Sequence, residues 1–324
     1  MHALIIKTSS LGDVVHTLPA LSDAHQLRPE IRFDWVVEEA FAEVPAWHRA
    51  IERVIPVAIR RWRRAPVRAW RSGEWQAFRT ALATDRYDQV IDAQGLIKSA
   101  LIARLVEAPR GGLDRRSARE PLASLAYDCG VAVPREMHAI ERTRSLFAQL
   151  LGYAVPGTPI DYGIDVTRLR ATASGQAVDS LLFLHGTSRD DKCWPEQHWQ
   201  DLCARAGNCG LKVLLPWGNA SEQARAHRIA QGASHVSVLP RMSVRELAAL
   251  MLDVRALVAV DTGLGHLAAA LGRPCVSLYG PTRVDLVGTR GANQLHVAVA
   301  VGVGMAAIKP EHVWQVLCGL VPLS

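Results

Sequence analysis

The sequence predicts an α/β protein that consists of two doubly wound halves. Short apolar runs, typical of buried parallel strands, alternate with amphipathic helix patterns over residues 1–152. The same alternation resumes near residue 181 and continues to residue 324. Between the halves, residues 153–180 carry Pro and Gly and contain no long apolar run, as is typical of a linker. We therefore expect two domains, 1–152 and 181–324, that face each other across a cleft at the carboxyl ends of both sheets.

The first half begins with an apolar strand and a small polar turn. The strand covers residues 2–7, and the turn leads into an apolar helix pattern, so Asp13 follows the carboxyl end of the strand. Pro19 either kinks this helix or lies in the first turn of a helix that begins near Thr17. Further strands are expected at 33–37, 53–57 and 87–92, and helices at 74–83, 98–107 and 138–151. The arginines at positions 110, 115, 116 and 119 are expected in a glycine-containing loop.

The second half shows the same alternation with clear boundary signals. Pro195 suits the first position of a helix, and Ser243 with Glu246 has the spacing of a capping box. Strands are expected at 180–184, 212–215, 236–239, 256–260 and 275–279, and helices at 195–208, 221–230, 243–252 and from 310 onward.

One turn of the second half has the features of a phosphate-binding site. The strand at 256–260 is followed by Asp261, and an Ala/Leu-rich helix begins almost at once, so residues 261–266 form a strand-to-helix turn. The backbone N–H groups of residues 262–265 then lie at the positive end of a helix dipole, where they can bind an anion. The alternative is that the glycines only make a tight turn and that Asp261 only caps the helix.

Two other polar stretches follow strand ends in the second half. Residues 186–192 offer the hydroxyls of Thr187 and Ser188 and the ammonium group of Lys192 to a diphosphate. Glu222 lies just past another strand end and can accept hydrogen bonds from ribose hydroxyls. Each residue also has a simpler interpretation, as a turn former, a surface charge or an acid in the first turn of a helix. Because carboxyl ends of parallel strands share one edge of the sheet, the three stretches together favour a nucleotide site.

The positive charge of the chain is concentrated in one segment. The sequence has 37 Lys and Arg against 31 Asp and Glu, and residues 59–71 alone carry six arginines, two tryptophans and no acid. Cations beside interfacial aromatic residues suit a bilayer surface or a phosphorylated glycolipid as well as nucleic acid. A solvated loop is the simpler alternative. We favour the membrane-facing interpretation, without a nucleic-acid partner.

Several function classes lack their motifs in this chain. A G-x-G-x-x-G fingerprint after the first strand and a Walker-type G-K-[ST] are absent, which argues against a simple dehydrogenase or a P-loop NTPase. Asp190 and Asp191 lack the Asp-x-Asp spacing that coordinates a sugar-nucleotide cation, so no metal is expected. The six cysteines lack metal or redox spacings and are expected to be reduced thiols. With no run of eighteen apolar residues and no signal peptide before the first strand, we expect a cytosolic protein that is at most peripheral to a membrane.

Seven short motifs occur in order along the chain. They are KTSSLGD at 7–13, HTLPAL at 16–21, WVVEE at 35–39, RRWR at 60–63, IDAQG at 91–95, RDDK at 189–192 and DTGLGH at 261–266. This set resembles the lipopolysaccharide heptosyltransferase I family over essentially the whole chain. The resemblance implies a GT-B fold of two Rossmann-like domains and transfer of heptose from ADP-L-glycero-β-D-manno-heptose to the first Kdo sugar of Kdo2-lipid A. It implies inversion, no metal or other cofactor, and a place on the cytoplasmic face of the inner membrane.

The same resemblance implies roles for individual residues. Asp13 would be the general base, with Asp92 and His16 as competing bases, and Lys192 would carry the charge of the leaving diphosphate. The expected donor contacts are Thr187, Ser188, Lys192, Glu222 to the ribose, Met242 to the adenine, and Asp261, Thr262, Gly263, Leu264 and His266 to the heptose and phosphates. The expected acceptor contacts are Arg60, Arg61, Arg63, Arg64, Lys98 and Arg119. The chain departs from the family pattern at Gly186 and Gly265, where the family has Ala and Ser, and at Ser188, where the family has Thr.

Three other functions stay open at this point. One is a different ADP-heptose-dependent heptosyltransferase, and another is a nucleotide-sugar epimerase of similar fold, which would not need the arginine segment. The third is a non-catalytic protein that binds a nucleotide or a polyanion. Release of ADP only in the presence of an acceptor distinguishes a transferase from the epimerase and from the non-catalytic binding protein.

Overall fold

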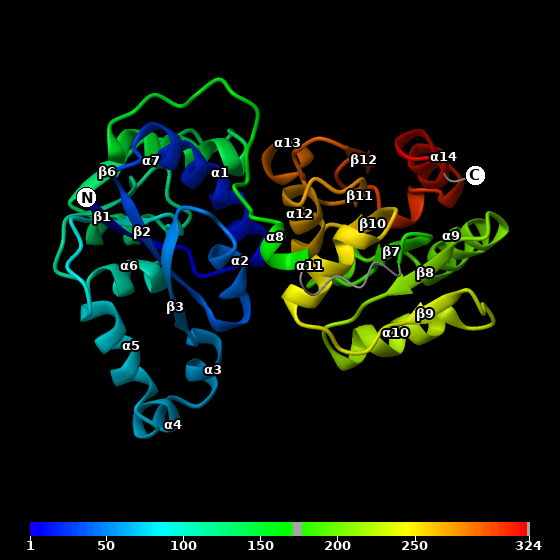
Figure 1. Cartoon of the computed structure of the whole chain (residues 1–324), viewed down its shortest axis with the longest axis horizontal. Coiled ribbons are helices and arrows are strands. Elements are labelled where there is room, and N and C mark those ends of the chain that lie inside the picture. The colour runs from blue at the N-terminus through cyan, green and yellow to red at the C-terminus, as the bar shows by residue number, and fades with distance from the viewer. Residues whose placement is uncertain (171–176, 323–324) are drawn as a thin grey trace. The chain divides into compact units, whose positions relative to one another are not determined.

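A computed structural model describes residues 1–170 and 177–322 of the chain (Figure 1). The chain divides into two compact units, Met1–Asp165 and Val166–Ser324, and each contains one six-stranded sheet with parallel pairing throughout. The predicted α/β class with two doubly wound halves is therefore confirmed. The division between the units falls inside the stretch 153–180.

The first unit has the strand order β3-β2-β1-β4-β5-β6. Its strands are β1 (His2–Ile6), β2 (Arg32–Glu38), β3 (Ile51–Val57), β4 (Gln89–Asp92), β5 (Arg110–Leu113) and β6 (Cys129–Val131). Its helices are α1 (Leu11–Leu27), α2 (Glu43–Ala46), α3 (Ile59–Arg64), α4 (Pro66–Arg71), α5 (Glu74–Ala83), α6 (Ile97–Ala103) and α7 (Ala139–Leu151), with short 3-10 turns η1 (Glu39–Phe41) and η2 (Pro121–Ala126). The chain winds outward from β1 in both directions, so β1 and β4 flank the point where the strand order reverses.

Along each strand of the first unit, successive side chains point to opposite faces of the sheet, so every second residue packs into the core on one face. Leu4 and Ile6 of β1 pack with Phe78 of α5 and Ile102 of α6, so these two helices cover one face of the sheet. Helices α1 and α7 pack against each other (Figure 1). An ion pair between Asp23 of α1 and Arg144 of α7 fixes this contact, with Nε and Oδ2 2.6 Å apart and side-chain exposures of 9% and 5%. Helix α1 thus has a fixed position relative to the core, and it carries Asp13 in its first turn.

The second unit has the order β12-β11-β10-β7-β8-β9, which is the order of the first unit when strands are counted from β7. Its strands are β7 (Ser180–Leu184), β8 (Lys212–Leu215), β9 (Val236–Val238), β10 (Ala256–Val260), β11 (Cys275–Tyr279) and β12 (Gln294–Ala298). Its helices are α8 (Thr167–Arg170), α9 (Glu196–Asn208), α10 (Ala220–Ala230), α11 (Val244–Asp253), α12 (Gly263–Ala270), α13 (Val284–Val287) and α14 (Pro310–Leu320), with η3 (Asp190–Lys192) and η4 (Met305–Ala307). The reversal point therefore lies between β7 and β10.

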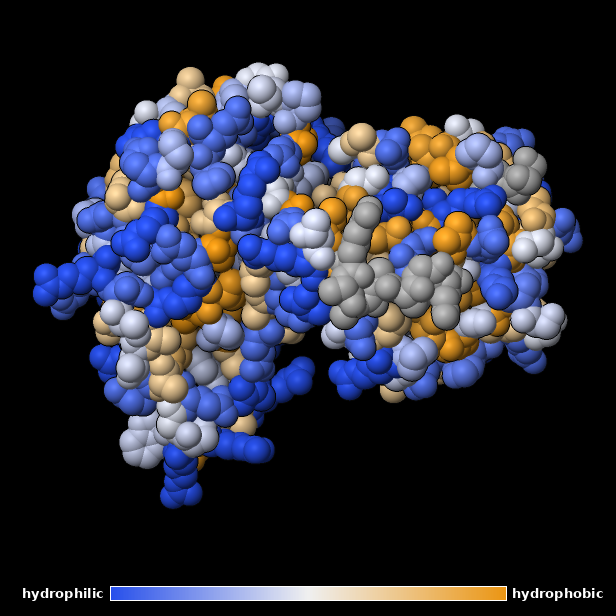
Figure 2. Space-filling view, viewed as in Figure 1, coloured by the Kyte–Doolittle hydropathy of each residue, from blue (hydrophilic) through white to orange (hydrophobic). Residues whose placement is uncertain are grey.

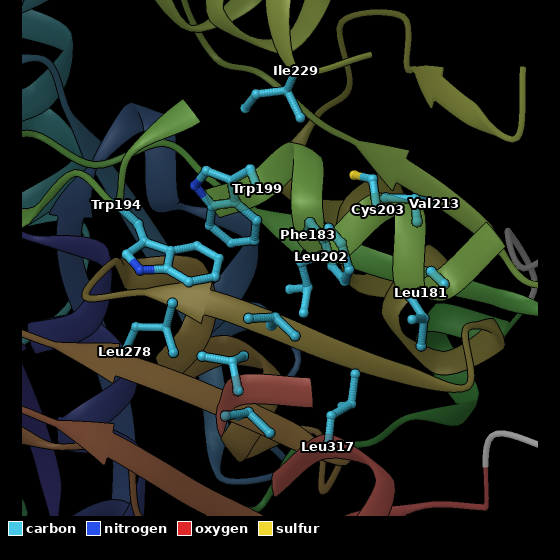
Figure 3. Close-up of a cluster of buried hydrophobic side chains, with 14 of the residues drawn as sticks. Leu181, Phe183, Trp194, Trp199, Leu202, Cys203, Val213, Ile229, Leu278 and Leu317 are labelled. Atoms are coloured by element: carbon cyan, nitrogen blue, oxygen red, sulfur yellow. The ribbon is translucent and has the colours of Figure 1, made fainter. Parts of the chain in front are cut away.

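An aromatic cluster forms the core on one face of this second sheet (Figure 3). Trp194 and Trp199 are buried, and their ring centroids lie 4.9 Å apart in an edge-to-face arrangement that suits the charge distribution of aromatic rings. Figure 3 shows Leu202 of α9 and Leu317 of α14 converging on the same cluster, next to Phe183 of β7. The rigid packing of β7 fixes the strand end from which residues 185–192 leave.

The arginine segment forms α3 and α4, so the simpler alternative of a solvated loop does not hold, since Pro66 starts a helix as readily as it ends one. Two sequence expectations differ from the structure. Residues 110–113, expected in a loop, form β5, and Gly111 and Gly112 are required there because Cβ atoms would meet Leu150 and Tyr127 at 2.5 and 2.4 Å. Strands β6 and β12 were not expected. For Pro19, which the sequence left between two positions, the structure shows a place inside the continuous helix α1.

The expected capping box of Ser243 and Glu246 is confirmed at the start of α11. Gly152 ends α7 in the left-handed conformation. All six cysteines are free. Among the described residues, no helix combines the length and apolar character needed to cross a bilayer.

We predict that Asp23→Asn destabilises the fold by about 3 kcal/mol, because it removes the buried carboxylate partner of the Arg144 guanidinium and leaves only the more exposed carboxylate of Glu141. Chemical denaturation followed by circular dichroism measures the free energy of unfolding. The matched control is Glu311→Gln, which breaks the exposed pair with Arg205 and is expected to leave the unfolding midpoint unchanged. An equal effect of the two substitutions would contradict the assigned role of the buried pair.

Candidate active site

Residues 261–266, the β10 turn, lie at the reversal point of the second sheet. The turn follows β10, which pairs with β7, and α12 begins at Gly263 with Thr262 as its extended N-cap residue. The predicted strand-to-helix turn is therefore confirmed. Reversal points of doubly wound sheets are the usual ligand sites of these folds, because neighbouring connections leave the strands toward opposite faces. The N-terminus of α12 adds a partial positive charge at this point.

The carboxylate of Asp261 does not cap α12 but binds two other side chains. Lys192 of η3 donates from Nζ to Oδ2 at 2.6 Å, and the hydroxyl of Thr282 donates to the same oxygen. Thr187 donates to the backbone carbonyl of Asp261 at 2.9 Å. These contacts join residues 185–192, the β7 loop, to the β10 turn. The structure therefore brings Thr187, Lys192 and Asp261 together, as the sequence predicted, and adds Thr282, which the sequence did not single out.

Glu222 also reaches the β7 loop. It lies in the first turn of α10, where Asn219 caps its backbone N–H at 3.0 Å, and its Oε2 accepts a hydrogen bond from the backbone of Gly218 at 2.7 Å. A Cβ atom at Gly186 would lie 2.8 Å from the carboxyl carbon of Glu222. Gly186 therefore makes room for this carboxylate. At the other departure from the family pattern, a Cβ on Gly265 would lie 3.3 Å from Cβ of Ala259, a tight contact.

Met242 and His266 occupy different environments. Met242 is half-buried directly before the N-cap residue of α11. The connection that leads to it from β9 is held by Trp217, whose indole N–H donates to the carbonyl of Leu239 at 2.7 Å. His266 is buried within α12, while Thr262, Gly263 and Leu264 are half-buried. Half-burial leaves these turn residues partly accessible to a ligand.

In the first unit, residues 7–13, the β1 loop, lie at the corresponding reversal point. Gln94, just after β4, accepts hydrogen bonds through Oε1 from the backbone N–H groups of Thr8 and Ser9 at 3.0 and 3.1 Å. Lys7 is buried and donates from Nζ to the carbonyl of Ala93 at 2.8 Å. The ends of β1 and β4 are thus joined by side chains as well as by strand pairing.

Asp13 lies in the first turn of α1 and faces a positive environment. Its Oδ2 accepts hydrogen bonds from the backbone N–H and the hydroxyl of Ser10 at 2.8 and 3.0 Å. Burial alone would raise the pKa of Asp13, but the ammonium group of Lys7, the Ser10 hydrogen bonds and the charge of Arg119 outweigh it, so this pKa lies below its usual value. Asp13 therefore combines a capping contact with a carboxylate that is ionised at neutral pH.

The two competing bases are engaged elsewhere. Asp92 is completely buried, accepts hydrogen bonds from the backbone N–H groups of Gln94 and Gly95, and binds the hydroxyl of Tyr127 at 2.7 Å. Burial raises the pKa of Asp92 despite these contacts. His16 is buried with its ring 5.6 Å from that of His138. The contacts of Asp92 thus shape the loop after β4. Of the three candidate bases, Asp92 and His16 are buried, and Asp13 is half-buried.

The predicted acceptor-binding cations fall into two groups. Lys98 donates to the hydroxyl of Ser9 at 3.2 Å, and Arg119 acts electrostatically on Asp13, so both belong to the surroundings of the β1 loop. The arginines of α3 lie beyond the end of β3. Arg61 is clamped between Glu39 and Glu74, whereas Arg63 and Arg64 form no ion pair with a described residue. Arg61 therefore also anchors α3 to its neighbours.

One cluster of the described residues has spacing suitable for a metal ion, namely His2, Asp34 and Glu52. These residues lie near the amino ends of β1, β2 and β3, at the opposite edge of the sheet from Asp13. Asp34 also accepts a hydrogen bond from Arg53 Nε at 2.9 Å. The cluster is thus separate from the candidate site.

Comparison with known proteins identifies the family. The family model described as glycosyltransferase family 9 (heptosyltransferase) matches residues 75–307. Lipopolysaccharide heptosyltransferase 1 of Escherichia coli (strain K12) is 52% identical over 299 residues, which cover 91% of this chain and 92% of the relative. The enzyme of the same name from Pseudomonas aeruginosa is 53% identical over 298 residues, covering 92% of this chain and 83% of the relative. The chain belongs to glycosyltransferase family 9.

The solved structures agree with this assignment. The structure of E. coli heptosyltransferase WaaC with ADP matches with a TM-score of 0.92 at 48% identity, covering 99% of this chain and 100% of that chain. E. coli ADP-heptose lps heptosyltransferase II, at 21% identity and a TM-score of 0.80, shares the fold. This family 9 chain is therefore a glycosyltransferase with a GT-B fold, as the sequence predicted.

Sequence reasoning assigned no role to three residues of the candidate site, Lys7, Gln94 and Thr282. Lys7 and Gln94 lie inside two of the short motifs, but their interactions with Asp13 and with the backbone of Thr8 become visible only in the fold, as does the contact of Thr282 with Asp261. The position of Lys7 at the end of a buried strand, followed by a polar turn, is the one hint that the sequence contains.

We predict that Lys7→Met raises the pKa of Asp13, because the substitution removes the positive charge that lowers this pKa most while the desolvation of the carboxylate remains. NMR titration of the labelled aspartate carboxyl carbon measures this value. Ser10→Ala, which removes one of two hydrogen bonds, should give a smaller rise. An unchanged pKa in Lys7→Met would show that the ammonium group does not set the ionisation of Asp13.

Proposed function

We propose that this chain transfers heptose from ADP-L-glycero-β-D-manno-heptose to the first Kdo sugar of Kdo2-lipid A, with inversion. The observation that carries this proposal is the similarity to E. coli heptosyltransferase WaaC with ADP-2-deoxy-2-fluoro heptose, with a TM-score of 0.88 at 48% identity over 98% of this chain. The relatives named lipopolysaccharide heptosyltransferase 1 support an acceptor that belongs to lipopolysaccharide.

The β10 turn and the β7 loop would bind the donor. Backbone N–H groups at the N-terminus of α12 and the hydroxyl of Ser188 suit a diphosphate, which accepts hydrogen bonds only. Thr187 would turn its hydroxyl from the carbonyl of Asp261 to the diphosphate. Lys192 would move part of its interaction from Asp261 to the diphosphate as negative charge develops on the leaving group. Asp261 and His266 would contact the heptose, Glu222 the ribose and Met242 the adenine. A metal ion has no required part in this scheme.

Asp13 would act as the general base. Ser10 donates both of its hydrogen bonds to Oδ2, which leaves Oδ1 to receive the proton of the acceptor hydroxyl. As the proton moves to Asp13, the acceptor oxygen forms a bond to the anomeric carbon, and the bond from that carbon to the diphosphate breaks, with its electron pair leaving on ADP. Attack opposite the leaving group inverts the anomeric centre.

Basic residues of the first unit would bind the acidic acceptor. Lys98 and Arg119 lie around the β1 loop, where a sugar carboxylate beside the reacting hydroxyl would be bound. Arg60, Arg63 and Arg64 on α3 suit the phosphates of the glycolipid and an anionic membrane surface. Such contacts agree with a peripheral enzyme on the cytoplasmic face of the inner membrane.

An epimerase has weaker support than a transferase. UDP-GlcNAc 2-epimerase from Methanocaldococcus jannaschii is 13% identical with a TM-score of 0.53, a likeness that concerns the fold alone. An epimerase also leaves the cations of α3 without a ligand.

We predict that ADP release from ADP-heptose requires Kdo2-lipid A and persists when a chelator is present.

We also predict that Asp13→Asn lowers turnover about 10²–10⁴-fold. Asparagine retains an oxygen that accepts the Ser10 hydrogen bonds but cannot take the proton. ADP binding, measured by calorimetry, should stay unchanged in this variant. Near-normal turnover of Asp13→Asn, or ADP release without acceptor, would refute the mechanism.

We predict that Lys192→Ala weakens ADP binding about tenfold to hundredfold, because a charge-assisted contact to the diphosphate is lost. The same calorimetric titration measures the change. Lys212→Ala, an exposed lysine at the amino end of β8 in the same unit, is the matched control and should bind ADP normally. Equal affinities of Lys192→Ala and wild type would remove Lys192 from the donor site.

A further inference from the structure

A largely apolar groove crosses the first unit beside the arginine segment. It has a volume of about 590 Å³, within the range of ligand pockets. Its walls come from α3, α4, the start of α5, and α6, and include Trp62, Trp70, Trp75, Leu101 and Leu105. The two cations of its lining are Arg63 and Lys98.

The aromatic wall of the groove is rigid. Trp62 donates its indole N–H to Glu74 at 2.8 Å, and its ring lies edge-to-face with Trp75 at 5.8 Å between centroids. Arg61 binds the same Glu74 and so fixes α3 to α5. Because the polar N–H of Trp62 is satisfied by Glu74, its ring can offer apolar carbon atoms to an occupant of the groove.

The opposite wall and the rim are unusually exposed for apolar residues. Trp70 is 74% exposed and Leu101 is 61% exposed. Seven of the fourteen exposed large apolar side chains of the described chain lie on or next to α4, α6 and η2. At the end of the first unit that carries α4 in Figure 1, Figure 2 shows protruding hydrophilic side chains among residues of intermediate hydropathy. Apolar surface of this kind marks a binding site.

One end of the groove lies at the candidate active site. Lys98, which lines the groove, donates to the hydroxyl of Ser9 in the β1 loop. Leu101 and Leu105 follow Lys98 at intervals of three and four residues, so the three side chains form one stripe along α6 and its end. This stripe extends about 10 Å from the β1 loop, given the helical rise per residue.

We infer that this groove binds a fatty acyl chain of the acceptor glycolipid, an inference that rests on the proposed function. An acyl chain gains stability by leaving water for the indole and leucine side chains. The phosphates attached to the same lipid would lie near Arg63 and the neighbouring arginines of α3 and α4, which complement their charge. The acyl chain and the reacting sugar would then be bound at the two ends of one continuous site.

The charge pattern favours a phosphorylated lipid over a protein partner. The segment 59–71 has six arginines and no acid, so an apolar helix bound in the groove would need a strongly acidic flank. The groove is lined by residues of several helices, which suits a single hydrocarbon chain better than a flat bilayer surface. The buried ring of Phe78 packs against Trp62 and Trp75 and supports the aromatic wall.

The test uses the full-length enzyme and two acceptors, Kdo2-lipid A in dispersing detergent and its fully deacylated form. In wild type, kcat/KM should be higher for the acylated acceptor. Leu101→Asn should lower the ratio of kcat/KM for acylated over deacylated acceptor about tenfold, through KM rather than kcat, since it removes one apolar contact with the chain. Leu125→Asn is the matched control, because Leu125 is 76% exposed on η2 but lies outside the groove lining.

A second readout does not depend on catalysis. Dodecyl phosphate that carries bromine at the end of its chain should quench the tryptophan fluorescence of wild type and of Leu125→Asn. At the same concentration, the quenching of tryptophan fluorescence in Leu101→Asn should be about tenfold weaker. Unchanged thermal midpoints exclude unfolding of these exposed-site variants. If both variants lose the acylated acceptor equally, the surface acts as a general bilayer contact and the groove assignment is wrong. If Kdo2-lipid A is not a substrate but the quenching pattern is as expected, the proposed function is wrong and the acyl-chain site is retained. If wild type shows no quenching, the acyl-chain site is wrong.

Discussion

The reversal of strand order between β1 and β4, and again between β7 and β10, is the constraint on which the chemistry of this protein depends. Neighbouring parallel strands that send their connections to opposite faces leave a gap at their carboxyl ends, where backbone N–H groups and polar side chains have no sheet partner. The chain fills each gap with a short polar loop and the N-terminus of a helix. Asp13 lies in the first gap and Asp261 in the second, each following the central strand of its sheet. Because the strands are completely buried, these loops have little freedom to move at their bases.

Each gap contains an acid next to a lysine, yet the two pairs differ in kind. Asp261 and Lys192 are in direct contact at 2.6 Å, and Thr282 adds a third partner, so a ligand that attracts Lys192 must share it with Asp261. In the first unit, Lys7 donates to the carbonyl of Ala93 and acts on Asp13 through its charge, while Ser10 makes the direct hydrogen bonds. The first arrangement suits the binding of a diphosphate whose charge grows during reaction. The second keeps a carboxylate ionised but accessible.

The fold of the arginine segment, residues 59–71, indicates which of its residues are structural and which can bind a ligand. As helices, α3 and α4 contribute Trp62 and Trp70 to the wall of the groove, together with Arg63. Arg61 is used to bind Glu39 and Glu74, and Trp62 also binds Glu74, so part of the segment is structural. The remaining arginines and the apolar groove together match the chemistry of a phosphorylated lipid, with charge and hydrocarbon side by side. This combination connects acceptor recognition with the membrane location proposed for the enzyme.

The sequence by itself determined the fold class, most strands and the polar loops at their ends. The strands 180–184, 212–215 and 275–279 match their predicted bounds, because continuous apolar runs between turn residues have few other stable arrangements in a buried sheet. It also determined the Asp261 turn and the family resemblance, which rests on ordered motifs. Only the tertiary structure decided that Gly111 and Gly112 belong to a strand. Glycine suits these two positions because Leu150 and Tyr127 occupy the space that a Cβ atom would need. It also decided the partners of Asp13 and Asp261, the clamp on Arg61 and the groove along α6. These features join residues far apart in the chain, and local periodicity contains no information about such contacts.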